Sequence, residues 1–460
     1  MPLWTSSDIA TATNGTASAY FDVTGVAFDS REIGAGDLFV AMPGTEHDGH
    51  RFVDGAFGRG AAGAIVSQPP RNPGAHPHVL VADTAAALNA LGVASRERSG
   101  ARVAGVTGSV GKTGTKEALA AALSRKPDVR VHRSVKSYNN HTGVPLSLAR
   151  MPADTDYGVF EMGMNHAGEI AALTRLVRPH VAVITTIAPA HIEFFPTGLD
   201  GIADAKGEIF QGLEPGGAAV IPFDIPQRDR LIGHAQRYAG EILTFGLGAG
   251  ADVRAREVID NGDSSTVTVT MPGVELCLTI GQPGAHWVSN GLAVLAAVHA
   301  LGADVGVAAL ALADMEQLAG RGARLRVRVG AGEALVIDES YNANPTSMRA
   351  TLAVLAREAG RKIAVLGAMR ELGAQSDELH AGLGPDVISS GVEFALLVGS
   401  GMEPLAAALE GKTEVRHVAD AATVDAALAT LIAPGDAILI KGSNSVGLSA
   451  LVASLKSRTA

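Results

Sequence analysis

The stretch VTGSVGKTGTK at residues 106–116 decides the fold of the chain's centre. It follows an apolar run at 102–106 and precedes an Ala- and Leu-rich run at 117–123, so the predicted order is strand, glycine turn, helix. In that order a glycine pattern becomes a phosphate-binding loop, because the helix begins where the backbone N–H groups converge. The common pattern starts with a glycine where this chain has Val106, so an ordinary glycine turn is the alternative. The Gly-Lys-Thr at the junction favours the phosphate loop.

Each residue type in this loop has a role in holding a nucleoside triphosphate. Gly108 and Gly111 let backbone N–H groups approach phosphate oxygens, Lys112 reaches the terminal phosphates, and Thr113 offers a hydroxyl to Mg²⁺. The sequence therefore predicts nucleoside triphosphate binding. The predicted contacts in the loop are Thr107, Gly108, Ser109, Val110, Gly111, Lys112 and Thr113.

Length and composition exclude several classes of protein. A chain of 460 residues is too long for one core, and about two to four domains are expected. The formal net charge of −10, without a long basic run, disfavours nucleic acid as a partner. The single cysteine, Cys277, excludes an internal disulfide and favours the cytosol, and we expect it in a buried strand. We expect no signal peptide and no membrane span, hence a soluble, cytoplasmic protein.

The pattern of apolar runs predicts an α/β protein with three domains, at residues 1–98, 99–317 and 318–460. In the first, a small α/β domain, we predict strands at 25–30, 37–42, 63–66 and 78–81 and a helix at 84–98. In the second we predict strands at 102–106, 157–161, 181–186, 218–221 and 241–245, alternating with helices. This alternation predicts a mostly parallel sheet with helices on both faces.

Residues 252–282 alternate polar and apolar around Asn261-Gly262, which predicts an antiparallel hairpin at the sheet edge before a helix at 288–301. The Gly- and Arg-rich stretch 318–326 is predicted to be a hinge. In the third domain, strands predicted at 334–338, 362–366, 395–398 and 437–441 alternate with helices, as in a Rossmann-like domain.

Two further side chains are predicted at the sheet edge that carries the loop. Glu161 ends the strand at 157–161, and His191 follows the strand at 181–186. The carboxyl ends of parallel strands face the ligand crevice, so both are candidate Mg²⁺ ligands. Alone, Glu161 is better explained as a solvated strand-end acid, and a lone histidine such as His191 is usually structural. The neighbouring phosphate loop favours the metal.

Polar residues are dense after a strand of the third domain, in VIDESYNANPTSM at 336–348. Pro345 suits the first turn of a helix, and Asn344 is the expected cap. A polar loop at a strand's carboxyl end is a candidate site. The segment KGSNS at 441–445 closes another strand with a positive charge and small donors.

These motifs, in this order, resemble the Mur ligase family. The resemblance covers nearly the whole chain and rests on TGSVGKTGTKE, EMGMNHAGEI, APAHIEFF, ADAKGEIF, GAHWVSN, GRGAR, DESYNANPTSM and LIKGSNS. DESYNANP is the most specific, and it indicates the branch that joins D-alanyl-D-alanine to UDP-N-acetylmuramoyl-tripeptide. Residues 28–52 and 137–148 look like that branch's uridine and sugar-peptide sites. The related folylpolyglutamate synthetase branch is the alternative, but its usual C-terminal loop motif is absent.

The resemblance implies an ATP-dependent amide ligase. In such a reaction a substrate carboxylate attacks the γ-phosphate of ATP, and the amine of the dipeptide then displaces phosphate from the acyl phosphate. The products would be the UDP-MurNAc-pentapeptide precursor of peptidoglycan, ADP and phosphate. A role in cell wall biogenesis would connect the enzyme to cell shape, cell division and the cell cycle. A monomer with two Mg²⁺ ions is expected.

The family also implies roles for residues that match its motifs. The implied catalytic residues are Lys112, Glu161, His191, Lys206 and Arg321, with Lys206 as a carbamate that would hold metal beside Thr113, Glu161 and His191. The implied further ATP contacts are Asn290 at adenine, Arg321 and Asp338. The implied substrate contacts are Ser30, Arg31, Asp48, Gly49 and His50 for uridine diphosphate, Asn139, Asn140 and Thr142 for the sugar-peptide, and Tyr341, Asn342 and Asn344 for the amine.

The chain departs from the family pattern at four positions. Gly114 stands where relatives often have threonine, Trp287 replaces an asparagine, Ala368 replaces an acid, and Asn444 replaces an arginine. None of them removes a predicted phosphate or metal ligand. Two other classes of function are the alternatives: a P-loop ATPase or small-molecule kinase, and a non-catalytic nucleotide-sugar binding protein.

Overall fold

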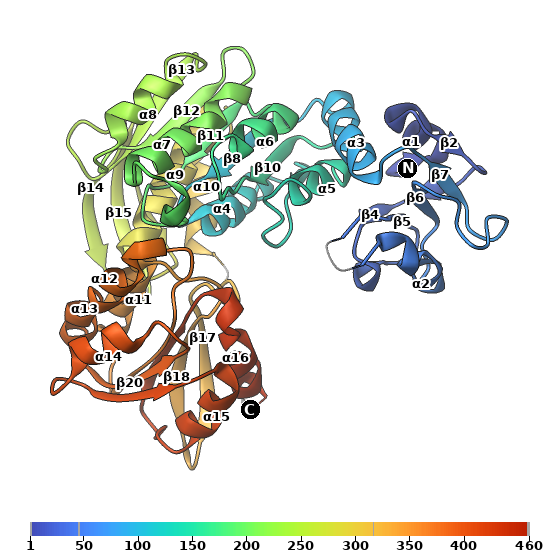
Figure 1. Cartoon of the computed structure of the whole chain (residues 1–460). Coiled ribbons are helices and arrows are strands. Elements are labelled where there is room, and N and C mark those ends of the chain that lie inside the picture. The colour runs from blue at the N-terminus through green and yellow to red at the C-terminus, as the bar shows by residue number, and fades with distance from the viewer. Residues whose placement is uncertain (1, 45–46, 316, 458–460) are drawn as a thin grey trace.

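The computed structural model describes residues 2–44, 47–315 and 317–457. Its strands form three large sheets and one two-stranded sheet, and the large sheets follow one another along the chain. The part of the chain around the central sheet lies between the other two parts, with the N-terminal part (blue) to one side and the C-terminal part (orange to red) below it (Figure 1). The predicted α/β class is confirmed.

The N-terminal part carries a five-stranded sheet in the order β2-β7-β6-β5-β4, with β1 and β3 paired beside it. Its helix α3 begins where the Asp83 carboxylate accepts hydrogen bonds from the N–H groups of Ala85 and Ala86, at 2.7 and 3.0 Å. The elements, with η for a 3₁₀ helix, are β1 (Trp4–Thr5), α1 (Ser6–Thr13), β2 (Thr16–Ala17), β3 (Asp22–Val23), β4 (Gly25–Ala27), η1 (Ser30–Glu32), β5 (Asp37–Val40), η2 (Gly49–Phe52), α2 (Val53–Gly58), β6 (Gly63–Val66), β7 (His78–Leu80) and α3 (Thr84–Arg98).

The central sheet has nine strands in the order β16-β15-β14-β13-β12-β11-β8-β10-β9. From β9 to β14 the pairs are parallel, and β15 and β16 are added antiparallel. The elements are β8 (Arg102–Thr107), α4 (Lys112–Ser124), β9 (Val131–Arg133), α5 (Gly143–Ala149), β10 (Tyr157–Glu161), α6 (Glu169–Val177), β11 (Val181–Ile184), η3 (Ile192–Phe194), α7 (Leu199–Gly207), η4 (Glu208–Gly212), β12 (Ala218–Pro222), α8 (Arg228–Ala235), β13 (Glu241–Gly246), β14 (Val253–Asp260), β15 (Ser265–Met271), β16 (Val274–Ile280), α9 (Ala285–Ala300) and α10 (Val305–Ala313).

Successive residues of the central strands face opposite cores. On β8, Ala104 and Val106 pack in the core that α4, α9 and α10 cover, while Val103 packs in the core that α6, α7 and α8 cover. Burying each aliphatic side chain of this kind contributes about 1.5–3 kcal/mol, so both faces need a helical layer. The predicted sheet with helices on both faces is confirmed, and it places the carboxyl ends of its parallel strands at one edge.

The edge of this sheet differs from the prediction in two respects. The expected hairpin is a three-stranded meander, β14-β15-β16, because a second turn at 272–273 adds β16. Cys277 lies on β16 but is exposed, so its predicted burial was wrong. The strand is the last of its sheet, and its first four residues are exposed or half-buried.

The C-terminal sheet has six strands in the order β17-β18-β22-β19-β20-β21, parallel except for β17. The successive residues Ile363 and Ala364 of β19 face opposite cores, and helices cover both faces of the sheet. The elements are β17 (Ala323–Val329), β18 (Gly332–Glu339), α11 (Pro345–Leu355), β19 (Lys362–Gly367), η5 (Gly373–Gln375), α12 (Ser376–Ala381), α13 (Gly384–Ser389), β20 (Val392–Val398), α14 (Glu403–Leu409), β21 (Glu414–Val418), α15 (Ala421–Ala429), β22 (Ala437–Lys441), η6 (Asn444–Val446) and α16 (Leu448–Lys456).

Strand β17 begins at Ala323, inside the stretch 318–326 that was predicted to be a hinge. Its residues alternate poorly in burial, since it is an edge strand rich in arginine. Strand β21 was not predicted. In the described part of the chain, no helix has both the length and the apolar character that a membrane crossing requires.

Candidate functional site

The phosphate loop lies between β8 and α4, as predicted. Gly108 and Gly111 have φ angles of 149° and 86°, which side chains rarely adopt. A Cβ on Gly111 would also stand 2.6 Å from Oδ1 of Asn290 on α9, so glycine is required there twice over. Lys112 folds back so that its Nζ donates to the Gly108 carbonyl at 2.7 Å. Burial lowers the pKa of Lys112.

Thr113 and Glu161 meet at this edge of the sheet. The Thr113 hydroxyl donates to Glu161 Oε2 at 2.8 Å, and Asn139 Nδ2 donates to Oε1 at 2.7 Å. Glu161 is 1% exposed and pairs with Val106, because β10 is the neighbour of β8. Glu161 therefore lies at the sheet edge that carries the phosphate loop, as predicted.

His191 stands in the left-handed region, with φ 58°, immediately before η3. Its Nδ1 contacts Oε2 of Glu371, which belongs to the C-terminal part of the chain. Burial, followed by the charges of Lys112 and Lys206, lowers the pKa of His191 to about 4. Burial also raises the pKa of Glu371. The contact thus joins a neutral imidazole, able to bind metal, to a carboxyl group.

Lys206 lies on α7 and is 1% exposed. No hydrogen bond or ion pair joins its Nζ to any other residue that the structure describes. Burial, followed by the charge of Lys112, lowers the pKa of Lys206 well below its usual value. Lys206 is thus buried rather than a surface lysine, although it is not among the residues that line the cavity below.

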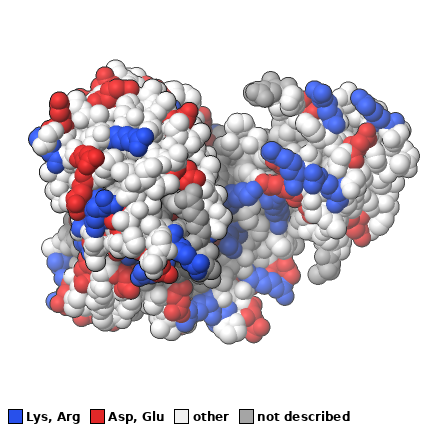
Figure 2. Space-filling view, turned by 90° about the horizontal axis from the view of Figure 1, so that it is seen from below, with Lys and Arg blue, Asp and Glu red and all other residues white. Residues whose placement is uncertain are grey.

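A cavity of about 520 Å³ lies between the central and C-terminal sheets. It brings together most of the residues predicted from separate motifs. Its central wall includes Ser109, Gly111, Lys112, Thr113, Asn139, Glu161, His191 and Asn290, and its C-terminal wall includes Arg321, Glu339, Tyr341, Asn342, Asn344 and Lys441. A second hollow lies elsewhere on the surface. Seen from below, a recess with basic side chains separates the N-terminal lobe from the rest of the molecule (Figure 2).

Arg321 and Asp338 have different positions at the hinge. Arg321 lies 4.3 Å above the ring of Tyr341, and its Nη2 donates to Ser137 Oγ of the central part at 3.4 Å. The buried Asp338 carboxylate accepts from the Gly320 N–H at 2.9 Å and from the Ser340 hydroxyl at 2.7 Å. It fixes the turn at Gly320 and does not line the cavity.

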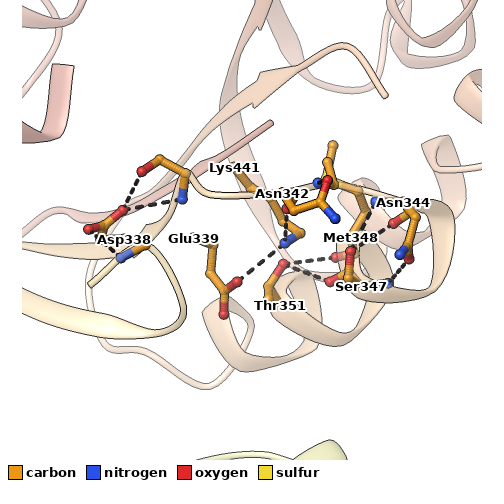
Figure 3. Close-up of polar contacts among 11 residues, drawn as sticks. Asp338, Glu339, Asn342, Asn344, Ser347, Met348, Thr351 and Lys441 are labelled. Atoms are coloured by element: carbon orange, nitrogen blue, oxygen red, sulfur yellow. Dashed lines mark hydrogen bonds and ion pairs between the residues drawn. The ribbon is translucent and has the colours of Figure 1, made fainter. Parts of the chain in front are cut away.

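The loop after β18 lies beside the end of β22 (Figure 3), and residues of both line the cavity. Asn344 caps α11 by accepting from the Ser347 N–H at 2.9 Å, as predicted. Lys441, at the end of β22, donates to the Asn342 carbonyl at 3.0 Å and to Glu339 Oε2 at 3.3 Å. Lys441 and Glu339 had no predicted role. The sequence feature that could have identified Lys441 as a site residue is a positive charge at the carboxyl end of an apolar strand.

The residues predicted for uridine diphosphate gather after β4 and β5, two neighbouring parallel strands. Asp48 accepts from the His50 N–H at 2.9 Å, and its Oδ1 contacts Nδ1 of the His50 ring at 2.6 Å. The Ser67 N–H donates to Nε2 of the same ring at 2.8 Å. Arg31 pairs with Asp29, although its side chain is 82% exposed. Ser30 begins η1 and the buried Gly49 begins η2.

Two residues predicted for the sugar-peptide have a local structural role. Asn140 Oδ1 accepts from the Gly143 N–H at 2.9 Å and from the Thr142 hydroxyl at 3.0 Å, which closes the turn that begins α5. Asn140 and Thr142 do not line the cavity, unlike Asn139.

Comparison with known families now identifies the chain. Residues 22–101 match the model "Mur ligase family, catalytic domain", residues 106–298 the "Mur ligase middle domain", and residues 323–444 the "Mur ligase, glutamate ligase domain". The chain belongs to the Mur ligase family. One relative, the UDP-N-acetylmuramoyl-tripeptide–D-alanyl-D-alanine ligase of Escherichia coli strain K12, is 35% identical over 94% of this chain and 93% of its own length.

Solved Mur ligases share the whole architecture. A MurF structure from Acinetobacter baumannii is 33% identical, covers 99% of each chain and has a TM-score of 0.85. The MurF ligase from Thermotoga maritima, solved in complex with ADP, is 29% identical, covers 94% of this chain and 97% of its own, and has a TM-score of 0.77.

The donor atoms of this Mur ligase suit Mg²⁺ bound together with phosphates. Thr113 Oγ1 and Glu161 Oε2 lie 2.8 Å apart in the cavity and are hard oxygen donors, which Mg²⁺ prefers. Within residues 2–44, 47–315 and 317–457, no three His, Cys, Asp or Glu side chains group as a complete metal site. That is compatible with Mg²⁺, which usually keeps few protein ligands beside water and phosphate oxygens.

Proposed function

We propose that this Mur ligase adds D-alanyl-D-alanine to UDP-N-acetylmuramoyl-tripeptide at the expense of ATP. The observation that carries the proposal is the interdomain cavity, which has a phosphate loop on one wall and the DESYNANP loop on the other. The curated relatives that bear this activity in their names match nearly the full length of the chain.

In the proposed reaction, the chain's own groups position two anions. The loop N–H groups and Lys112 hold the β- and γ-phosphates of ATP, Asn290 contacts adenine, and Arg321 reaches the nucleotide from the hinge. The tripeptide carboxylate attacks the γ-phosphate, ADP leaves, and the dipeptide amine then displaces phosphate from the acyl phosphate. Phosphoryl transfer requires positioning and charge neutralisation rather than a protein nucleophile.

We propose that Thr113 and Glu161 hold one Mg²⁺ and that His191 holds a second. When bound, such ions neutralise charge between the phosphates and the attacking carboxylate. We further propose that Lys206 is carbamylated: its neutral amine adds to CO₂, an N–C bond forms, and one proton is released. The resulting anion would help to hold the second ion, and the burial of Lys206 without a partner among the described residues supports this chemistry.

The remaining contacts are proposed from the resemblance. The proposed contacts for uridine diphosphate are Ser30, Arg31, Asp48, Gly49 and His50. The proposed domain boundaries lie near residues 98 and 317. Asn139, Asn140 and Thr142 would contact the sugar-peptide, and Tyr341, Asn342 and Asn344 the amine. Asp338 would reach the ribose only after the hinge rearranges. We propose a cytoplasmic monomer that serves cell wall biogenesis and, through it, cell shape and division.

The test is phosphate release from ATP and Mg²⁺ with UDP-N-acetylmuramoyl-tripeptide, with and without D-alanyl-D-alanine. The proposal expects stoichiometric release of phosphate with pentapeptide formation, and only when both substrates are present. Release that needs neither substrate would instead indicate an ATPase, and a phosphorylated product would indicate a kinase.

A further inference from the structure

Lys441 is a buried cation that the proposed reaction does not use. It is the last residue of β22, and its side chain is 2% exposed. Lysines are almost never fully buried unless a partner compensates the loss of hydration. The position of Lys441 on the cavity wall therefore needs an explanation beyond the packing of the strand.

The partners of Lys441 leave part of its ammonium free. Its Nζ donates to the Asn342 carbonyl at 3.0 Å and to Glu339 at 3.3 Å, and an ammonium has three N–H donors. Among the residues that the structure describes, no third acceptor is bonded to Nζ. Glu339 and Lys441 are register partners on β18 and β22, so both side chains leave the same sheet edge (Figure 3).

The other lysine and arginine side chains that line the cavity bond to its central wall. Lys112 belongs to the phosphate loop, and Arg321 reaches across the hinge to Ser137. Lys441 lies on the C-terminal wall, which it shares with Arg321, beside the loop proposed for the amine substrate. A dipeptide whose amine faces the phosphate loop turns its carboxylate toward that wall.

We propose that Lys441 binds the carboxylate of the dipeptide substrate and that Glu339 and the Asn342 carbonyl position its ammonium. The proposal rests on the proposed ligase function and adds the group that selects a free carboxylate at the far end of the amine substrate. A charge pair at this buried side chain is stronger than one at the surface, because the local dielectric is lower. Glu339 compensates the cation while the site is empty of dipeptide.

The experiment compares D-alanyl-D-alanine with D-alanyl-D-alaninamide, which lacks the charged carboxylate, in full-length enzyme. We expect the wild type to prefer the acid about 10- to 100-fold in kcat/KM, the size of one charge-assisted hydrogen bond. Lys441→Met should reduce the preference to within about 3-fold, while the KM values for ATP and for UDP-tripeptide change by less than about 3-fold. Lys441→Arg should retain most of the preference.

The matched control is Arg361→Met, which breaks the Arg361–Asp436 pair (2.7 Å) at the opposite end of the same sheet. It should leave the preference for the acid unchanged. If Lys441→Met does not fold, Glu339→Gln keeps the cation and removes its anionic partner, and it should alter the KM of the acid more than that of the amide.

Two results would overturn the assignment. One is an undiminished preference in Lys441→Met or, where that variant does not fold, equal effects of Glu339→Gln on acid and amide. The other is a rise in the KM for ATP alone. A wild-type enzyme whose phosphate release ignores the dipeptide would overturn the proposed function itself, which is a different outcome.

Discussion

Trp287 packs directly against Gly114: a Cβ added to Gly114 would stand 2.9 Å from Cη2 of the indole ring. Trp287 is 6% exposed on α9, and Gly114 lies in the first turn of α4, so the ring cannot retreat to solvent. Both residues depart from the pattern expected for the family. In the structure, the large ring of Trp287 on α9 fills the space beside Gly114 on α4, which has no side chain.

Gly114→Thr is therefore expected to destabilise the wild type by about 1–3 kcal/mol, because the new side chain overlaps the indole ring. In a Trp287→Asn background the same change should cost less than about 1 kcal/mol, because the ring is gone. Urea unfolding of the two single variants and the double variant measures the coupling. Equal costs in both backgrounds would show that the two positions are independent.

Glu161→Gln tests the proposed metal position. The amide keeps the size of the side chain and can still contact Thr113 and Asn139, but it removes the negative charge that attracts Mg²⁺. We expect the Mg²⁺ concentration for half-maximal activity to rise at least about 10-fold, as for loss of a charged ligand. Glu241→Gln, an exposed change at the start of β13, is the control. An unchanged Mg²⁺ titration would exclude Glu161 as a ligand.

Lys206→Ala tests the proposed carbamate. We expect activity to fall at least about 100-fold and to recover in part with added formate or acetate, because a small carboxylate replaces the missing anion. In wild-type protein incubated with ¹³C-bicarbonate, a carbamate carbon signal should appear by NMR and be absent from the variant. A folded variant that no carboxylate rescues, together with a wild type without that signal, would contradict carbamylation.

Domain closure can be tested at Arg321, which bridges Ser137 and Tyr341 across the cavity. Closure excludes water and protects an acyl phosphate from hydrolysis. Small-angle scattering should show the wild type becoming more compact with substrates and an ATP analogue. Arg321→Lys keeps the charge but loses the planar stacking on Tyr341, so it should compact less and turn over more slowly. Identical scattering profiles with and without ligands would argue against closure.

The sequence predicted best those residues whose positions follow from the order of strands, loops and helices along the chain. The loop at 106–116 carries its own strand and helix, and Glu161 and His191 follow from the rule that parallel strands end at one edge. Contacts made by packing had no local signal: Gly114 and Trp287 are far apart in sequence, and so are Glu339 and Lys441. Cys277 and β17 were misassigned for a related reason, because edge strands expose residues that a central strand would bury.

His132 gives the enzyme a predictable acid sensitivity that is independent of catalysis. Its Nε2 contacts the Ser147 carbonyl at 2.7 Å, which fits a neutral donating ring, and its imidazole lies against Phe160. Burial is the main cause that lowers the pKa of His132 to about 4; the Ser147 hydrogen bond opposes this shift, and the charges of Arg150 and Arg133 add to it.

Between pH 4 and about 6.5 the unfolded chain binds a proton at His132 that the native state refuses, so stability falls as pH falls through that window and is unaffected above it. His132→Gln keeps a donor for Ser147 without a titrating group. Its free energy of unfolding should therefore decline less between pH 7 and pH 5, by on the order of 1–2 kcal/mol after allowance for partial exposure of the ring. If the free energy of unfolding, measured in urea, changes equally with pH in both proteins, His132 has the same pKa in the native and unfolded states, and this prediction is contradicted.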